Sequence, residues 1–476
     1  MEPVMIVKRI EIACAVWMLL ELSGLGRSVL GQEAPEVAVA RAKAVAAAVY
    51  NVFPTPEKDA LRRKGFAEDL ARAFLSGEGG HVDRLLAPYT VQPLAGISRE
   101  LLLGMCHLAS GDRQRGMMAL EQASVLTPNY PEVFIELGRF AFQENRYADA
   151  LAQFEKADRL VDKGNWPLYL IDHFESRCLD GFANVALVQG QSKKAMEHLR
   201  DLERRLPDDP SVLKRLGETA FRLKDYDAAR KYIKDYSDLV PGLAPVDVQL
   251  AAMAIRAKQY DEARVFLEQA SARHRDDPAT LIAMTQLAVD MDDADRALRL
   301  VTEAKRLGPL DERMMLLEGQ ARYMAGDIDV ATRLFEDLSR RRPNNVGFSN
   351  LYALALANDS DVSNRGLARQ IAMRNLRANP QQFNVLSVAG WLEYSIGSKL
   401  NGGKLMARLE QEVTVAGASI DRDTAFFLAN YQSDQGRIEE AVSLLENALS
   451  AHGLFLHQQQ AEALLSRLKN SGAGSR

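Results

Sequence analysis

A 34-residue period constrains the fold of this chain more than any other feature of its sequence. Alanine recurs five times at that interval, as Ala195, Ala229, Ala263, Ala297 and Ala331. An apolar side chain stands four residues after each of these alanines. Such a period is typical of arrays in which each unit is one supersecondary element that covers the apolar face of its neighbour.

A second set of small residues occurs twelve positions before the place of the repeated alanine in its unit. Its members are Gly104, Gly138, Ala183, Gly217, Ala251 and Gly319. Two antiparallel helices approach closely only where small residues lie at their crossing. Proline, which cannot continue a helix, closes four units at one phase, as Pro207, Pro241, Pro309 and Pro343. Each unit is therefore predicted to be a pair of helices.

Two segments carry the second-helix pattern most completely. They are YADALAQFEKA at residues 147–157 and YDEARVFLEQA at residues 260–270. With the small, apolar and proline phasing, the region 97–453 resembles the tetratricopeptide-repeat (TPR) family. The resemblance implies an all-α fold: a right-handed α-α superhelix, a solenoid of about ten helical pairs, with a C-terminal capping helix.

The pattern divides the chain into four expected parts. They are a signal peptide at residues 1–31, an irregular N-terminal capping repeat at 32–96, the TPR array at 97–453, and a capping helix with a disordered tail at 454–476. Within the array, eleven extra residues at 165–175 predict a longer first helix or a packed loop, with a functional protrusion as the alternative. Residues 358–364 and 398–403 are predicted to be turns.

The N-terminus resembles a secretory signal. Lys8 and Arg9 precede a short apolar run, and small residues follow it. The run is shorter than the roughly twenty residues that a spanning helix needs, so no stable membrane span is expected after cleavage. Glu11 and Glu21 flank the run and leave two alternatives open: a retained amphipathic helix, or a start codon placed too far upstream. We expect an exported, periplasmic or envelope-associated protein, with a cytoplasmic one as the alternative.

Composition and motifs give no indication of catalysis or of a cofactor. The net charge is −5 and no basic block suggests nucleic acid as a partner. Cys106 and Cys178 are predicted to be buried apolar residues. His452 and His457 are predicted to lie on the surface, and no metal-site spacing occurs. Acid pairs such as 276–277 and 292–293 are predicted to cap helices.

The TPR resemblance implies that the first helices of the pairs line a concave binding face. By phase, the outward candidates on these helices are Arg139, Gln143, Asn184, Lys214, Glu218, Arg222, Gln286, Gln320, Tyr323, Trp391, Tyr394 and Asn430. The alternative for each is a solvated side chain, or one packed between helices. A clamp for a C-terminal carboxylate is disfavoured, since Asp180 and Phe426 stand where the family's lysine would be.

These patterns together predict a scaffold for protein–protein interaction without a cofactor or metal. It is expected to bind extended peptides or to assemble a complex in the bacterial cell envelope. An intracellular adaptor is the first alternative, and an enzyme with its site in the groove is a remote one. The sequence leaves the identity of the protein or peptide partner open.

Overall fold

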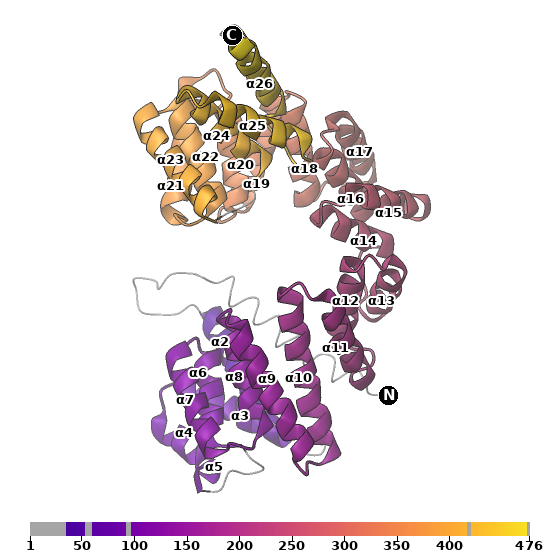
Figure 1. The fold of residues 1–476 in the computed structure, drawn as a ribbon, viewed down its shortest axis with the longest axis vertical. Coiled ribbons are helices and arrows are strands. Elements are labelled where there is room, and N and C mark those ends of the chain that lie inside the picture. Colours follow the sequence, from indigo (N-terminus) through magenta and orange to yellow (C-terminus); the bar gives the residue numbers. More distant parts are fainter. Residues whose placement is uncertain (1–34, 53–59, 92–96, 417–419, 474–476) are drawn as a thin grey trace. The chain divides into compact units, whose positions relative to one another are not determined.

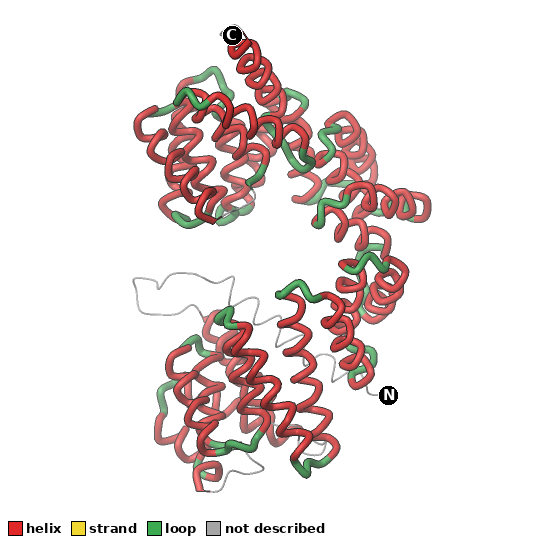
Figure 2. Tube along the Cα trace, in the orientation of Figure 1, coloured by secondary structure: helices red, strands yellow, loops and turns green. Residues whose placement is uncertain are grey.

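A computed structural model describes residues 35–52, 60–91, 97–416 and 420–473. The predicted signal peptide at 1–31 lies outside these residues. The described chain is helical throughout, with no β-strand in these ranges (Figures 1 and 2), so the all-α prediction is confirmed. The chain divides after Leu243 into two compact units, which we call unit 1 and unit 2.

Unit 1 begins with helices that precede the regular array. They are α2 (Pro35–Asn51), α3 (Ala60–Leu75), α4 (Gly79–Leu86) and α5 (Pro88–Val91). Four helical pairs follow: α6 (Arg99–Ala109) with α7 (Arg113–Leu126), α8 (Pro131–Gln143) with α9 (Tyr147–Lys163), α10 (Leu168–Val188) with α11 (Ser192–Arg205), and α12 (Pro210–Arg222) with α13 (Tyr226–Leu239).

Unit 2 contains six further pairs and a last helix. The first three pairs are α14 (Val246–Arg256) with α15 (Tyr260–Arg273), α16 (Pro278–Asp290) with α17 (Ala294–Leu307), and α18 (Glu312–Met324) with α19 (Ile328–Arg341). The others are α20 (Val346–Leu356) with α21 (Val362–Ala378), α22 (Phe383–Ile396) with α23 (Lys399–Ala416), and α24 (Arg422–Asp434) with α25 (Ile438–Ser450). Helix α26 (Gln458–Ala473) packs on α25 and α24, as a capping helix would.

The crossing of each pair explains the small residues of the sequence period. Ala195, Ala229, Ala263, Ala297 and Ala331 are all fully buried. A Cβ added at Gly138 of α8 would lie 2.7 Å from the ring of Phe154, which stands four residues after Ala150 on α9. A Cβ added at Gly181 of α10 would lie 2.6 Å from the same ring, again too close for a methyl group. The glycine is therefore required because a large side chain of the partner helix fills its place.

The turn inside eight of the ten pairs also repeats with the period. Its left-handed position, at positive φ, is occupied by Gly111, Asn145, Gly190, Lys224, Lys258, Asp292, Gly326 and Gly436. Glycine adopts this conformation without steric cost, whereas a lysine does so at a cost of about 1 kcal/mol. The pairing of the helices thus sets the turn geometry, which is kept even where a lysine makes a positive φ unfavourable.

The eleven extra residues at 165–175 lengthen a first helix, as predicted. Helix α10 has 21 residues, against 13 in α8 and α12. The indole of Trp166, just before it, donates to the carbonyl of Leu160 at 3.1 Å and packs edge-on against Tyr130 and Phe174.

Two predicted turns are shorter than expected. Helix α21 already begins at Val362, capped by Asp361, and α23 begins at Lys399. The glycines at 402 and 403 therefore lie inside a helix. A Cβ at Gly402 would come within 2.3 Å of the backbone of Tyr394, so this glycine serves a close helix crossing and not a turn.

Candidate functional site

In unit 1 the first helices of successive pairs, α8, α10 and α12, are joined by a ladder of charged side chains. Arg177 on α10 binds the carboxylates of both Glu132 and Glu136 on α8. These two carboxylates are almost completely shielded from solvent. A buried acid is tolerated only when it is paired, so Arg177 fixes the position of α10 against α8.

The ladder continues from α10 to α12. Arg215 on α12 binds the carboxylate of Asp180 and donates to the side-chain oxygen of Asn184 at 2.9 Å. The amide of Asn184 also donates to Asp180 at 3.1 Å. Asn184, a predicted groove residue, thus already has partners on its own helix and on its neighbour.

His173 belongs to the same ladder as a neutral group. Burial lowers the pKa of His173 to about 4. Its Nε2 lies 3.3 Å from Glu132, so at neutral pH the imidazole acts as a hydrogen-bonding partner of the carboxylate and not as a second cation.

A stripe of side chains on α12 stays outside the ladder. Lys214 and Arg222 are exposed and Glu218 is partly exposed, at the i, i+4 spacing that places them on one helix face. Among the described residues none of the three has an ion pair within 4.0 Å. Arg139 on α8 is exposed too and donates to Glu136 at 2.8 Å, while Gln143 is partly buried. We call the α8, α10 and α12 surface with this stripe the first-helix face.

In unit 2 the candidates on α16 and α18 lie in a different environment. Gln286 donates to the carboxylate of Asp290 at 3.0 Å. Gln320 and Tyr323 are buried, with 8% and 3% of their surface exposed. The two α18 side chains therefore do not form an open surface.

The remaining candidates belong to an aromatic cluster. Trp391 stacks on Phe427 with 4.9 Å between ring centroids and 6° between planes. The hydroxyl of Tyr394 donates to Asp434 at 2.9 Å, and its ring is buried. Asn430 donates to a backbone carbonyl of its own helix at 2.9 Å. In this region Tyr394 is thus packed between helices and not exposed in a groove, while Trp391 is half-buried.

What covers this cluster is the chain itself. Residues 451–457, between α25 and α26, form what we call the C-terminal turn, and its His457 packs against Phe426 and Phe427 of the cluster. The prediction that His457 lies on the surface is wrong, since only 5% of it is exposed, whereas His452 is exposed as expected. Some contacts of the C-terminal turn join residues more than 100 positions apart, for example Tyr323 and His457, and no local pattern in the sequence indicates them.

Other predictions about individual residues are confirmed. Cys106 and Cys178 are fully buried, and burial raises the pKa of each thiol to about 12, which leaves them unreactive. Asp277 and Asp293 cap α16 and α17 by accepting backbone N–H groups. No helix among the described residues is both long enough and apolar enough to cross a membrane.

Comparisons with known proteins agree with this architecture. Two family models, each described as a tetratricopeptide repeat, match the chain: one at residues 254–321 and the other at 101–165, 181–244 and 316–364. No curated protein sequence matches the chain.

Solved structures similar to the chain include yeast Tom70, at 13% identity over 86% of this chain and 96% of that one, with a TM-score of 0.35. A tetratricopeptide repeat protein from Parabacteroides merdae is 15% identical over 54% and 97% of the two chains, with a TM-score of 0.33. The pilF protein of Pseudomonas aeruginosa is 19% identical over 48% and 97%, with a TM-score of 0.27. At these levels no function is transferred from them.

Proposed function

The chain belongs to the tetratricopeptide-repeat family, whose repeats form protein-interaction scaffolds, and we propose that its first-helix face in unit 1 binds an extended segment of a partner protein. The fold of the family is generally a non-catalytic scaffold, and we propose that role here. The observation that carries the proposal is the stripe of Lys214, Glu218 and Arg222 beside a ladder whose charges are already paired.

The ladder supports binding because it fixes the positions of the three helices before the partner binds. Arg177 and Arg215 hold three helices in register, so the stripe on α12 is presented on a fixed surface. A preorganised surface loses less entropy on binding than a mobile one. Lys214 and Arg222 would meet carboxylates or backbone carbonyls of the partner, and Glu218 would accept from its backbone N–H groups.

Photo-crosslinking tests this face directly. We would place a photo-reactive side chain at position 214, and in a control at Lys193, an exposed lysine on the second helix α11 of the same unit. A discrete adduct is expected from position 214 and not from 193, and adding Arg222→Glu should reduce its yield several-fold. Equal labelling from both positions, or none from 214, would contradict the proposal.

We further propose that the partner lies in the bacterial cell envelope. The support is the signal-like segment at residues 1–31, where basic residues precede a short apolar run. N-terminal sequencing of the protein from fractionated cells tests this step by itself. A mature N-terminus near residue 32 in the envelope fraction is expected, whereas a chain that keeps residues 1–31 in the cytoplasm would favour an intracellular adaptor.

A further inference from the structure

The C-terminal turn of unit 2 is held both by α24 and by helices that are distant in sequence. The backbone N–H of Gly453 donates to the carbonyl of Asp290, at the end of α16, at 2.7 Å. The ring of His452 packs edge-on against Tyr260 of α15, with 5.4 Å between centroids. The turn is thus bound where an earlier repeat of the same unit ends its first helix.

Arg422, at the start of α24, also binds the turn. Its Nη1 donates to the carbonyl of Gly453 at 2.7 Å and its Nε to the carbonyl of Ala448 at 2.7 Å. The same guanidinium lies 4.5 Å from the ring centroid of Phe455. Arg422 therefore recognises both the backbone and an aromatic side chain of the turn, as an arginine in a peptide-binding site does.

The next part of the turn is recognised through His457. Its Nδ1 lies 2.7 Å from Asp423, and its backbone N–H donates to the same carboxylate at 3.0 Å. On the other side, Nε2 lies 3.2 Å from the hydroxyl of Tyr323, which also accepts from Asn358 at 2.8 Å. The imidazole lies nearly parallel to the ring of Phe426, with 5.3 Å between centroids.

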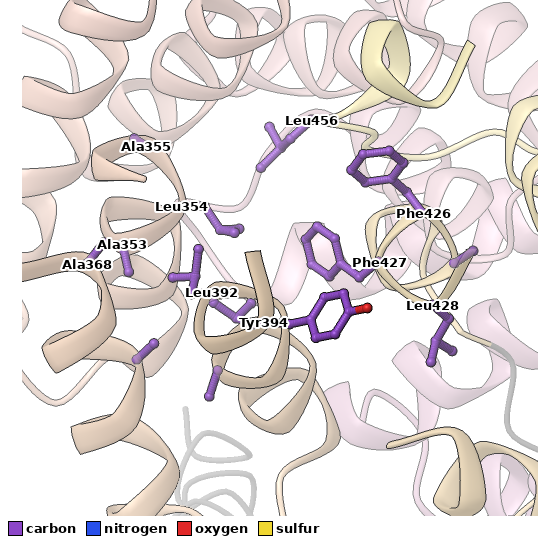
Figure 3. Close-up of a cluster of buried hydrophobic side chains, with 14 of the residues drawn as sticks. Ala353, Leu354, Ala355, Ala368, Leu392, Tyr394, Phe426, Phe427, Leu428 and Leu456 are labelled. Atoms are coloured by element: carbon purple, nitrogen blue, oxygen red, sulfur yellow. The ribbon is translucent and has the colours of Figure 1, made fainter. Parts of the chain in front are cut away.

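Three apolar side chains complete the fit. Phe455 is fully buried and Leu456 is 5% exposed, while Leu454 packs against two clusters of buried apolar side chains in unit 2. Figure 3 shows Leu456 in one cluster with Phe426, Phe427 and Leu354. Gly453 is thus held through its backbone, Leu454 and Phe455 through their side chains, and Leu456 and His457 through both. A peptide-binding site likewise combines main-chain hydrogen bonds with pockets for side chains.

We propose that residues 453–457 are an internal ligand that occupies a peptide-binding site of unit 2. The matching partner is a protein segment that combines a glycine, adjacent aromatic and aliphatic side chains, and a histidine hydrogen-bonded to Asp423 and Tyr323. Such a segment binds only after it displaces the internal one. This site is separate from the first-helix face of unit 1, so each proposal stands or fails without the other.

Cleavage of the folded chain tests the proposal. A protease-recognition sequence inserted between the exposed Ser450 and Ala451 allows the covalent link to α25 to be cut while the protein is otherwise complete. We expect the fragment that starts at Ala451 to stay bound after cleavage. It should then be exchanged by a fluorescent peptide with the sequence of residues 451–473, added at micromolar concentration.

Matched peptides identify what is recognised. Phe455→Ala and His457→Ala should each weaken exchange at least tenfold, whereas Gln459→Ala, at an exposed position of α26, should leave it within twofold. In the uncleaved chain, the same two substitutions should increase uptake of the unsubstituted peptide at least tenfold over the native chain.

Two results would overturn the inference. If cleavage unfolds unit 2, as seen by loss of a cooperative helical transition, then the turn is part of the core and not a ligand. If the cleaved protein stays folded but its fragment leaves and the labelled peptide does not bind, then the surface has no affinity of its own for this chemistry.

Discussion

Nη1 of Arg422 lies 2.9 and 2.8 Å from the two carboxylate oxygens of Asp292, although 130 residues separate them in the chain. The side chain of Arg422 is 6% exposed and that of Asp292 is 17% exposed. This pair joins the first turn of α24 to the turn between α16 and α17, and with the C-terminal turn it ties the last regular pair of unit 2 to one four pairs earlier.

We expect Arg422→Ala to destabilise unit 2 by about 2–4 kcal/mol, because it leaves Asp292 and two backbone carbonyls without a buried donor. Hydrogen exchange should show the effect first at the Gly453 N–H. The exposed pair of Arg342 with Glu312 provides the control, and Arg342→Ala should cost less than about 1 kcal/mol. Equal losses in the two variants would show that the long-range pair contributes nothing special.

Gly138→Ala should destabilise unit 1 by about 1–3 kcal/mol, since the new methyl group would overlap the ring of Phe154. The matched control is Gly65→Ala in α3, where no atom lies within 4 Å of the added Cβ. That change should stabilise by up to about 1 kcal/mol through helix propensity. Urea denaturation measures both, and a smaller loss for Gly138→Ala when Phe154→Leu is also present would identify the ring as the cause.

Lys224→Gly is expected to stabilise unit 1 by about 0.5–1 kcal/mol. Lys224 has a φ of 60°, in the left-handed region, and is exposed, so glycine removes the backbone strain without loss of a buried contact. Gly111→Ala, at the same phase with a φ of 91°, should have the opposite sign. Thermal unfolding of the two variants suffices, and a destabilising Lys224→Gly would contradict this account of the turn.

The stability of unit 2 should depend on the ionisation of Asp290. Burial is the main cause that raises the pKa of Asp290 to about 6, and the nearby Asp292 adds to it. A pKa raised in the folded state means that the folded chain binds the proton more tightly, so this group's contribution is most favourable near pH 4 and is lost as pH rises through about 6.

The difference between the native chain and Asp290→Asn isolates that contribution. Asparagine keeps the oxygen that accepts from Gln286 but carries no charge. Relative to the native chain, the variant should therefore become more stable as pH rises from about 4 to 7, as measured by urea midpoints at both ends. A difference that does not change with pH would show that Asp290 is not the titrating group.

Prediction from sequence was most successful where a geometric requirement, such as the close crossing of two helices, can be met by only one kind of residue. The buried alanines from Ala195 to Ala331 and the glycine at 138 follow directly from the close crossing of two helices. The same reasoning failed at residues 398–403, because a glycine pair is equally compatible with a turn and with a close crossing. Gly402 serves the crossing, and only the position of Tyr394 on the facing helix reveals this.

The candidate binding residues of unit 1 and unit 2 differ in how well the sequence predicted their surroundings. On α12 the helix phase places Lys214, Glu218 and Arg222 on one exposed to half-exposed stripe. In unit 2 the same phase places Tyr323 and Tyr394 on inward-facing positions that other parts of the chain bury. Phase gives the direction of a side chain on its helix but carries no information about what packs against it.

By itself, the sequence determined the helical pairs, their order and the places where they cross, because these depend on residues within about 34 positions of one another. Only the tertiary structure decided which of the resulting surfaces stay open. The contacts of Arg422 with Asp292 and of His457 with Tyr323 span 130 and 134 residues. Such contacts depend on the combined geometry of several successive repeats, which the sequence of a single repeat does not determine.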